Sequence, residues 1–266
     1  MLEVKTAPPL RELLLGEAPT SVLRSLSFEE LRSYLPALAD LKMSPPAGRD
    51  TCGHKDNLEH SFKVLENAIR LEEEGPDLIL RTAALLHDIG KPATRSYSGG
   101  RASFTMHETV GARMIPSVLK AEGYSKEEIS LVVLLVSLHM RAFGFKYSVW
   151  TDSAVRRLVT DAGGWDNFAK LLKIFRSDLT TKNASHRRSV LAGIARLEEA
   201  SRALIEKDAR AARRPAINGN EVMEAFGLEP GPRLGRLMRF LNTDEGLSLT
   251  RDEALARLAA ILEEEN

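Results

Sequence analysis

Apolar residues recur at helical spacing along most of this chain, whereas the strict alternation typical of half-buried strands is scarce. Between Leu58 and Ile69 they stand at i, i+4, i+7 and i+11, and between Ile129 and Val136 at i, i+3, i+4 and i+7. Ser27, Ser125 and Thr250 each precede a glutamate by three residues at the start of such a run, which is the spacing of a capping box. We therefore expect an all-α fold.

The segment from Leu78 to Asp88 is apolar nearly all round and runs into Gly90 and Pro92. This pattern predicts a buried central helix that stops at the glycine. Further helices are expected at Val110–Glu122, Asp152–Asp161, Phe168–Leu179, Ser189–Lys207, Glu221–Phe226, Pro232–Leu241 and Asp252–Glu264. The exception is Thr94–Met106, where Gly99-Gly100 separates two short polar segments and predicts a small hairpin or flap near the functional site.

The chain has 266 residues, enough for one large domain or a core domain with small appendages. Helix-breaking residues gather at Met43–Cys52 and again at Ala209–Asn220. We therefore expect a helical lead-in at residues 1–50, a central domain at 51–208 and a helical tail at 209–266.

Charge and cysteine content exclude several classes of protein. Lys plus Arg and Asp plus Glu each number 37, so no global positive field holds a polyanion and any nucleic-acid contact must be local. The single cysteine, Cys52, excludes an intrachain disulfide framework and any multi-cysteine metal site. We find neither a signal peptide nor an apolar run long enough to span a membrane, and expect a cytoplasmic protein with no membrane partner.

Four of the six histidines, namely His60, His87, His107 and His139, have apolar residues one helical turn away and are expected to face inward. Asp178 has the same setting. By contrast, His54 and His186 have no apolar face, and we leave them out of the site.

A single inward histidine is more often a hydrogen-bonded core residue than a ligand, and that interpretation stays open for each one. The combination of four inward histidines with two inward aspartates favours a metal site, because burying carboxylates such as Asp88 and Asp178 costs many kcal/mol unless they are paired. No arginine lies three or four residues from either aspartate. A divalent cation would neutralise the carboxylates and use neutral imidazoles as ligands.

The order His60, then His87-Asp88, then Asp178 resembles the signature of the HD-domain phosphohydrolases. His107 and His139 stand where two-metal members of that superfamily carry additional histidines. The resemblance implies an HD-domain helical core at the centre of the chain.

A closer resemblance extends from about Leu10 to Leu258. It is to the C-terminal half of the HD-bearing bacterial CCA-adding tRNA nucleotidyltransferases, and its clearest segments are His54–Ala68, Leu80–Thr94, His107–Arg113, Trp150–Asp161, Asp178–Asn183, Ile217–Met223 and Gly227–Gly235. In that family an N-terminal head carries the nucleotidyl-transfer chemistry, and we expect this chain to lack it. CCA addition by this chain alone is therefore not expected.

The superfamily resemblance implies a ligand set. One divalent ion would be held by His60, His87, Asp88 and Asp178, and a second by Asp88, His107 and His139. Mixed histidine and carboxylate ligation suits Mn, Fe, Co, Ni or Zn better than Mg, and leaves the choice among them open. Asp88 and Lys91 are the candidate catalytic residues.

The resemblance also implies a function: hydrolysis of 2′,3′-cyclic phosphodiesters or 2′-phosphomonoesters of nucleotides or RNA ends by a metal-activated hydroxide. Deoxynucleotide triphosphohydrolysis stays an alternative. Lys91, Arg141, Arg156 and Arg157 are candidate ligands of the substrate phosphate. For Lys91 the competing interpretation is a solvated cation at a helix end, and for the arginines a surface charge.

The alternative function is a non-catalytic body that binds tRNA or another RNA and partners a separate nucleotidyltransferase head. Arg233, Arg236 and Arg239 recur every third residue and would form a phosphate track along one helix. The simpler interpretation of these arginines is a solvated helix face.

Overall fold

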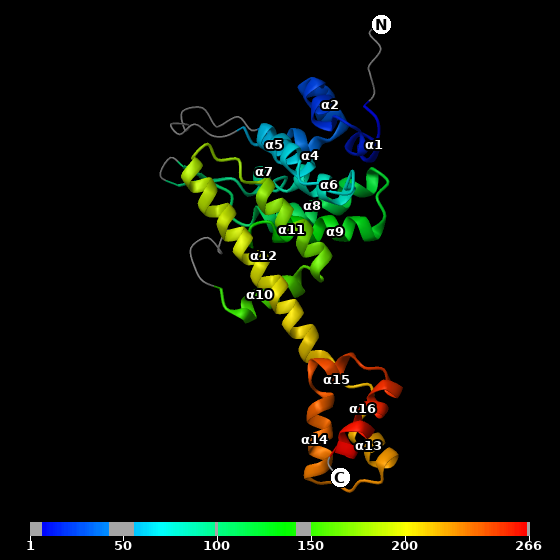
Figure 1. The fold of residues 1–266 in the computed structure, drawn as a ribbon. Helices are drawn as coiled ribbons and strands as arrows, with labels where there is room; N and C mark the ends of the chain where they lie inside the picture. The colour runs from blue at the N-terminus through cyan, green and yellow to red at the C-terminus, as the bar shows by residue number, and fades with distance from the viewer. Residues whose placement is uncertain (1–6, 43–55, 99–100, 142–149, 265–266) are drawn as a thin grey trace. The chain divides into compact units, whose positions relative to one another are not determined.

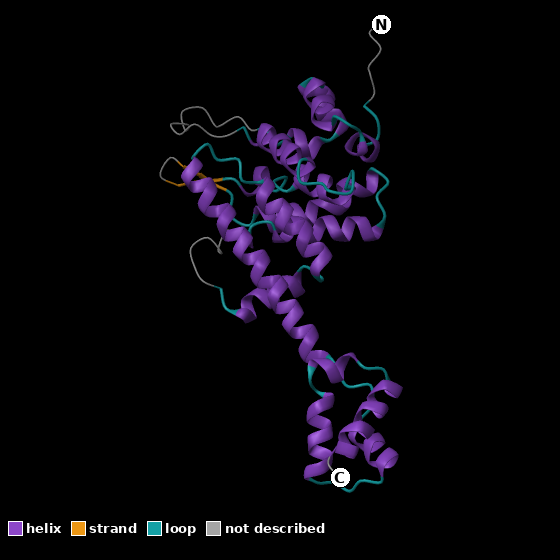
Figure 2. Cartoon of the chain, in the orientation of Figure 1, coloured by secondary structure: helices purple, strands orange, loops and turns teal. Residues whose placement is uncertain are grey.

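The computed structural model describes residues 7–42, 56–98, 101–141 and 150–264. Within these ranges the chain is almost entirely helical, and the strands are confined to one short hairpin (Figure 2). The prediction of an all-α fold is confirmed. Two predicted features, the break at Met43–Cys52 and the turn at Gly99-Gly100, lie outside the described residues.

The chain divides into two compact units, Met1–Ser201 and Arg202–Asn266, and the division falls within one long helix, α12. The helices of the first unit are α1 (Leu10–Leu15), α2 (Pro19–Ser25), α3 (Phe28–Tyr34), α4 (Pro36–Ala39), α5 (Asn57–Ile69), α6 (Leu78–Leu86), α7 (Lys91–Thr94), α8 (His107–Ala121), α9 (Lys126–Leu138), α10 (Asp152–Asp161), α11 (Trp165–Ser177) and the start of α12 (Ala184–Ala212). The second unit continues with α13 (Gly219–Phe226), α14 (Pro232–Leu241), α15 (Asp244–Ser248) and α16 (Arg251–Glu264). No helix among the described residues is both long and apolar enough to cross a membrane.

Three of the predicted helices begin with a capping box. Ser27 and Ser125 accept a hydrogen bond from the backbone N–H three residues on, and the glutamate at that position accepts one from the serine N–H. Thr250 makes the same reciprocal pair with Glu253 at the start of α16. Each box satisfies backbone donors that a helix start leaves without partners, so the three predicted starts are confirmed.

The core of the first unit is built around α6, whose residues from Leu80 to Leu86 are all buried. Helices α5, α9 and α11 pack against it, and α8 packs against α9 (Figure 1). Buried Arg81 ties α1 to this core, because its guanidinium donates to the carbonyls of Leu14 and Gly16 and makes a bidentate pair with Glu72. The lead-in is thereby attached to the helix that carries the His-Asp pair.

The central helix was predicted to stop at Gly90, and α6 ends at Leu86, four residues before that glycine. Gly90 has φ −78° and ψ −13°, a conformation open to any residue. A Cβ at this position would instead lie 2.1 Å from the backbone oxygen of His107 and 2.5 Å from the backbone nitrogen of Gly111. The glycine is needed because the backbone after α6 touches the backbone of α8.

The predicted hairpin is present as β1 (Ser96–Ser98) and β2 (Arg101–Ser103), paired antiparallel with Ser96 opposite Ser103. It lies between α7 and α8, so it joins Lys91 to His107 along the chain. The second unit has a core of its own, formed by Ile217, Val222, Leu237, Leu241, Ala254 and Leu258.

Candidate metal centre

The candidate metal ligands come from five different segments, and most of them stand at helix ends. His60 lies within α5, His87 and Asp88 follow α6 directly, and His107 is the first residue of α8. His139 and Asp178 are the residues that end α9 and α11. Because these helices pack around α6, their ends bring all six side chains together.

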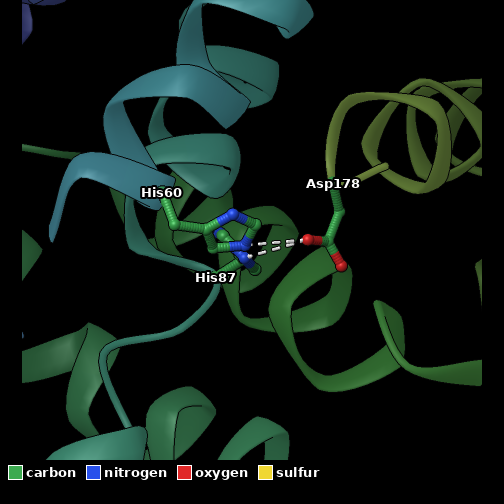
Figure 3. A group of neighbouring side chains, drawn as sticks. All are labelled: His60, His87 and Asp178. Atoms are coloured by element: carbon green, nitrogen blue, oxygen red, sulfur yellow. Dashed lines mark ion pairs between the residues drawn. The ribbon is translucent and has the colours of Figure 1, made fainter. Parts of the chain in front are cut away.

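The first group consists of His60, His87 and Asp178 (Figure 3). The Nε2 atom of His60 lies 2.9 Å from Asp178 Oδ1, and that of His87 lies 3.7 Å from the same oxygen. Both imidazoles therefore point their Nε2 atoms at one carboxylate.

The second group consists of Asp88, His107 and His139. Asp88 Oδ1 lies 3.2 Å from His107 Nε2 and 3.9 Å from His139 Nε2. Asp88 Oδ2 faces the first group instead, at 3.5 Å from His60 Nε2 and 3.2 Å from His87 Nε2. One buried carboxylate thus presents a separate oxygen to each group.

Hydrogen bonds on the far side of the rings set the tautomers. His87, His107 and His139 each lie with Nδ1 within 2.9 Å of the carbonyl oxygen three residues earlier in the chain. A carbonyl can only accept, so Nδ1 carries a proton in each ring, and where a ring is neutral its Nε2 has a free lone pair. His60 Nδ1 is held differently, 3.1 Å from the hydroxyl of Thr180.

Two observations indicate that these lone pairs are placed for a cation. The buried Nε2 of His87 makes no well-formed hydrogen bond. Burial opposes protonation of this ring, but the charge of Asp88, 3.2 Å away, outweighs burial and raises its pKa, so the nitrogen faces a site that attracts positive charge. The Nε2 atoms of His107 and His139 face each other at 3.2 Å, and where both rings are neutral neither can donate to the other. Burial, with His87 nearby, lowers the pKa of His139 to about 4, which keeps that ring neutral.

Both aspartates are ionised. Burial opposes the charge on Asp88, but His87, His107 and Lys91 outweigh it and hold the pKa of that carboxyl well below its usual range. Burial likewise opposes the charge on Asp178, whose pKa is nevertheless lowered to about 2, chiefly by the bond from His60. Two buried carboxylates and four imidazole nitrogens are a donor set that fits divalent transition metals.

A cavity of about 280 Å³ opens beside the ligands. Its lining consists of Asn57, His60, Asp88, Lys91, His107, Met140, Asp178, Leu179, Thr180, Thr181 and His186. The two metal-ligand groups therefore border a space that can receive a substrate.

Lys91 lies on this cavity, but it is not the solvated cation of the competing interpretation. Its Nζ atom lies 2.5 Å from Asp88 Oδ2 and over the ring of Phe104, and its side chain is 17% exposed. Lys91 thus supplies a positive charge beside Asp88, although no arginine lies three or four residues from that aspartate.

None of the three arginines that we considered as phosphate ligands, Arg141, Arg156 and Arg157, is among the residues that line the cavity. Arg141 and Arg157 both pair with Asp161, at 2.9 Å and 3.9 Å. Their role in phosphate binding stays a prediction.

The tail arginines Arg233, Arg236 and Arg239 lie on α14 in the second unit. Arg236 and Arg239 are exposed, and Arg233 is partly buried. Their role in RNA binding stays a prediction too.

Sequence reasoning missed four polar residues that line the cavity, namely Asn57, Thr180, Thr181 and His186. Thr180 contacts His60, and His186 is a histidine that we left out. The only signal for these two is closeness in sequence to Asp178, because neither has the apolar helix face by which the ligands were found.

Comparison with known proteins agrees with this geometry. Residues 57–163 match the HD domain family, a range that includes every candidate ligand except Asp178. This chain contains an HD domain.

Homology extends beyond the HD domain. The chain is 31% identical over 218 residues to the A-adding tRNA nucleotidyltransferase of Deinococcus radiodurans, covering 78% of this chain and 48% of that protein. It is 32% identical over 255 residues to the CC-adding tRNA nucleotidyltransferase of Thermus thermophilus, covering 94% of this chain and 54% of that protein. The chain is thus homologous over most of its length to the HD-containing region of these enzymes, and it spans about half of their length.

Proposed function

We propose that this HD-domain chain is a metal-dependent phosphohydrolase that acts on 2′,3′-cyclic phosphodiesters and 2′-phosphomonoesters of nucleotides or RNA ends. One observation carries the proposal. The lone pairs of His107 and His139 face each other beside one oxygen of Asp88, while the other oxygen faces His60 and His87. Where both rings are neutral their Nε2 lone pairs repel each other, and a divalent cation beside Asp88 would be held by both nitrogens and the carboxylate oxygen.

The proposed centre takes two ions. His60, His87, Asp88 and Asp178 hold one, and Asp88, His107 and His139 hold the other. The mixed nitrogen and oxygen donors favour Mn, Fe, Co, Ni or Zn over Mg, which prefers an all-oxygen shell. When bound, such ions act as Lewis acids toward phosphoryl oxygens and activate water at neutral pH.

The residues of the chain orient and hold the reactants. The Nδ1 hydrogen bonds of the histidines fix the ring positions before any ligand arrives, which reduces the entropy lost on binding. Lys91 lies on the cavity with its ammonium at Asp88, where it donates to a phosphoryl oxygen. At about 280 Å³ the cavity lies near the lower end of the range of ligand pockets, which suits a phosphate with part of its sugar.

Hydrolysis of 2′,3′-cyclic AMP by the metal-stripped protein, titrated with Mn²⁺, Ni²⁺, Co²⁺ and Mg²⁺, tests the proposal. We expect turnover with the transition metals that is lost in Asp88→Ala and retained in Asp161→Ala, which removes a carboxylate outside the centre. Circular dichroism checks that both variants keep their helices. Absence of turnover with every metal, or equal turnover in Asp88→Ala, would refute the proposal.

A second candidate function is supported by the relatives, both of which are named as tRNA nucleotidyltransferases. In this alternative the chain is a non-catalytic body that binds tRNA and partners a separate nucleotidyltransferase head. A gel-shift assay with tRNA distinguishes the two. Binding that is lost when Arg233, Arg236 and Arg239 are replaced by alanine, in a protein without hydrolase activity, would favour the alternative.

A further inference from the structure

The cavity has polar lining that the metal centre does not use. Four of its lining residues are candidate metal ligands, and two more are bonded directly to those ligands. The polar side chains that remain among the lining residues are those of Asn57, Thr181 and His186. Asn57 is the first residue of α5, Thr181 lies in the segment before α12, and His186 lies in the first turn of α12.

The position of His186 is fixed relative to Asp178 by consecutive hydrogen bonds. The N–H of Thr180 donates to the Asp178 carbonyl at 2.8 Å, and the N–H of Asn183 donates to the Thr181 hydroxyl at 3.3 Å. The N–H of His186 then donates to the Asn183 side chain at 3.0 Å, which caps the first turn of α12. His186 is therefore held on an ordered segment that begins at a metal ligand.

The polar side chains of Asn57, Thr181 and His186 suit a sugar more than a bare phosphate. An imidazole, a hydroxyl and an amide each offer both hydrogen-bond donors and acceptors, as the hydroxyl groups of a ribose require. Met140 and Leu179, which line the same cavity, offer apolar surface for the ring carbons of the sugar.

We propose that His186 binds the sugar-phosphate part of a nucleotide substrate, beyond the phosphoryl group that the metal centre takes. Thr181 and Asn57 provide further hydrogen-bond donors and acceptors for the same part of the substrate. This inference rests on the proposed function for its substrate class. It makes His186 a residue that contacts substrate and has no part in holding metal.

The test compares His186→Ala and His186→Asn with the wild-type protein and with Ser185→Ala, an exposed neighbour that does not line the cavity. Binding of adenosine 3′-monophosphate, a nucleotide outside the proposed substrates, to the Mn²⁺-loaded protein is measured by calorimetry. Hydrolysis is measured with 2′,3′-cyclic AMP and with p-nitrophenyl phosphate, which has no sugar. Mn²⁺ binding by each variant is measured separately.

We expect His186→Ala to weaken nucleotide binding about three- to tenfold, the usual effect of losing a hydrogen bond to a neutral hydroxyl. The KM for 2′,3′-cyclic AMP rises with it, while Mn²⁺ binding and p-nitrophenyl phosphate hydrolysis keep their wild-type values. His186→Asn, which keeps a hydrogen-bond donor, recovers part of the affinity, and Ser185→Ala has no effect.

Failure of the inference and failure of the proposed function give different results. If the wild-type protein hydrolyses neither phosphoester, the proposed function is wrong, and the binding measurement alone decides the role of His186. The inference is overturned if His186→Ala binds the nucleotide as tightly as wild type. It is equally overturned if the wild type binds no nucleotide, or if the variant loses Mn²⁺ or both substrates alike.

Discussion

Each candidate histidine ligand owes its orientation to one hydrogen-bond partner on the Nδ1 side of its ring. For His87, His107 and His139 this partner is a carbonyl of the same helical turn, so no single side-chain substitution removes it. For His60 the partner is the Thr180 hydroxyl, which belongs to the segment after α11 and can either donate or accept. His60 is therefore the ligand whose orientation depends on a side chain.

Thr180→Val keeps the shape of the side chain but removes the hydroxyl. We expect it to weaken Mn²⁺ binding by about 10- to 100-fold, the usual effect of removing a group that orients a metal ligand. Thr180→Ser restores the hydroxyl and should bind Mn²⁺ as the wild type does, which isothermal titration calorimetry can measure. Wild-type affinity in Thr180→Val would show that His60 needs no such support.

Lys91 competes with metal for Asp88, because its ammonium already lies at Oδ2. Lys91→Met should therefore bind Mn²⁺ at least as tightly as the wild type, while its kcat/KM for 2′,3′-cyclic AMP falls because a cation at the substrate phosphate is lost. Weaker Mn²⁺ binding in a folded Lys91→Met protein would contradict this account.

At the residue scale, apolar neighbours one helical turn away predicted which histidines face inward, and the structure brings these four together with Asp88 and Asp178. That these residues hold metal stays a prediction. The sequence did not predict that Thr180 and His186 belong to the site, because their contacts are made between segments and not along one helix. Lys91 is only three residues from Asp88 in the sequence, so an ion pair between them could be expected. Only the structure shows that the lysine side chain is largely buried at that carboxylate.

At the scale of elements, long amphipathic helices with capping boxes were predicted closely, and α10 and α14 have the predicted bounds. Short helices such as α4 and α7 were not predicted, because four residues carry no periodic signal. The close approach of the turn after α6 to α8 was also not predictable. The sequence shows Gly90 but not the backbone that it touches.

Gly90→Ala should destabilise the first unit by about 3 kcal/mol or more, because the added methyl overlaps the His107 carbonyl and the α8 backbone. Since His107 is a candidate ligand, Mn²⁺ affinity should fall as well. Gly235→Ala is the matched control: its Cβ meets only the flexible end of Arg239 at 3.7 Å within α14. That change should be neutral or stabilise by about 0.5–1 kcal/mol in urea unfolding. Equal stability of the two variants would contradict the packing argument.

At the scale of the whole molecule, all six candidate ligands belong to Met1–Ser201, while Arg202–Asn266 has its own core. A metal bound at 100 times its Kd adds about 2.7 kcal/mol to the unit that holds it. For a unit of this size the added stability corresponds to a Tm increase of roughly 5–11 °C.

Calorimetric unfolding of the intact chain should therefore show that Mn²⁺ raises only the transition of the first unit. Asp88→Ala should show no increase. An equal shift of every transition, or none in the wild type, would argue against a metal centre confined to the first unit.

The number of Mn²⁺ ions bound by the metal-stripped protein at equilibrium tests the central claim most directly, with Asp88→Ala measured beside it. Because Asp88 presents one oxygen to each ligand group, we predict two ions for the wild type and the loss of both high-affinity sites in the variant. A wild-type protein that binds no ion, or an Asp88→Ala variant that still binds two, would contradict the account.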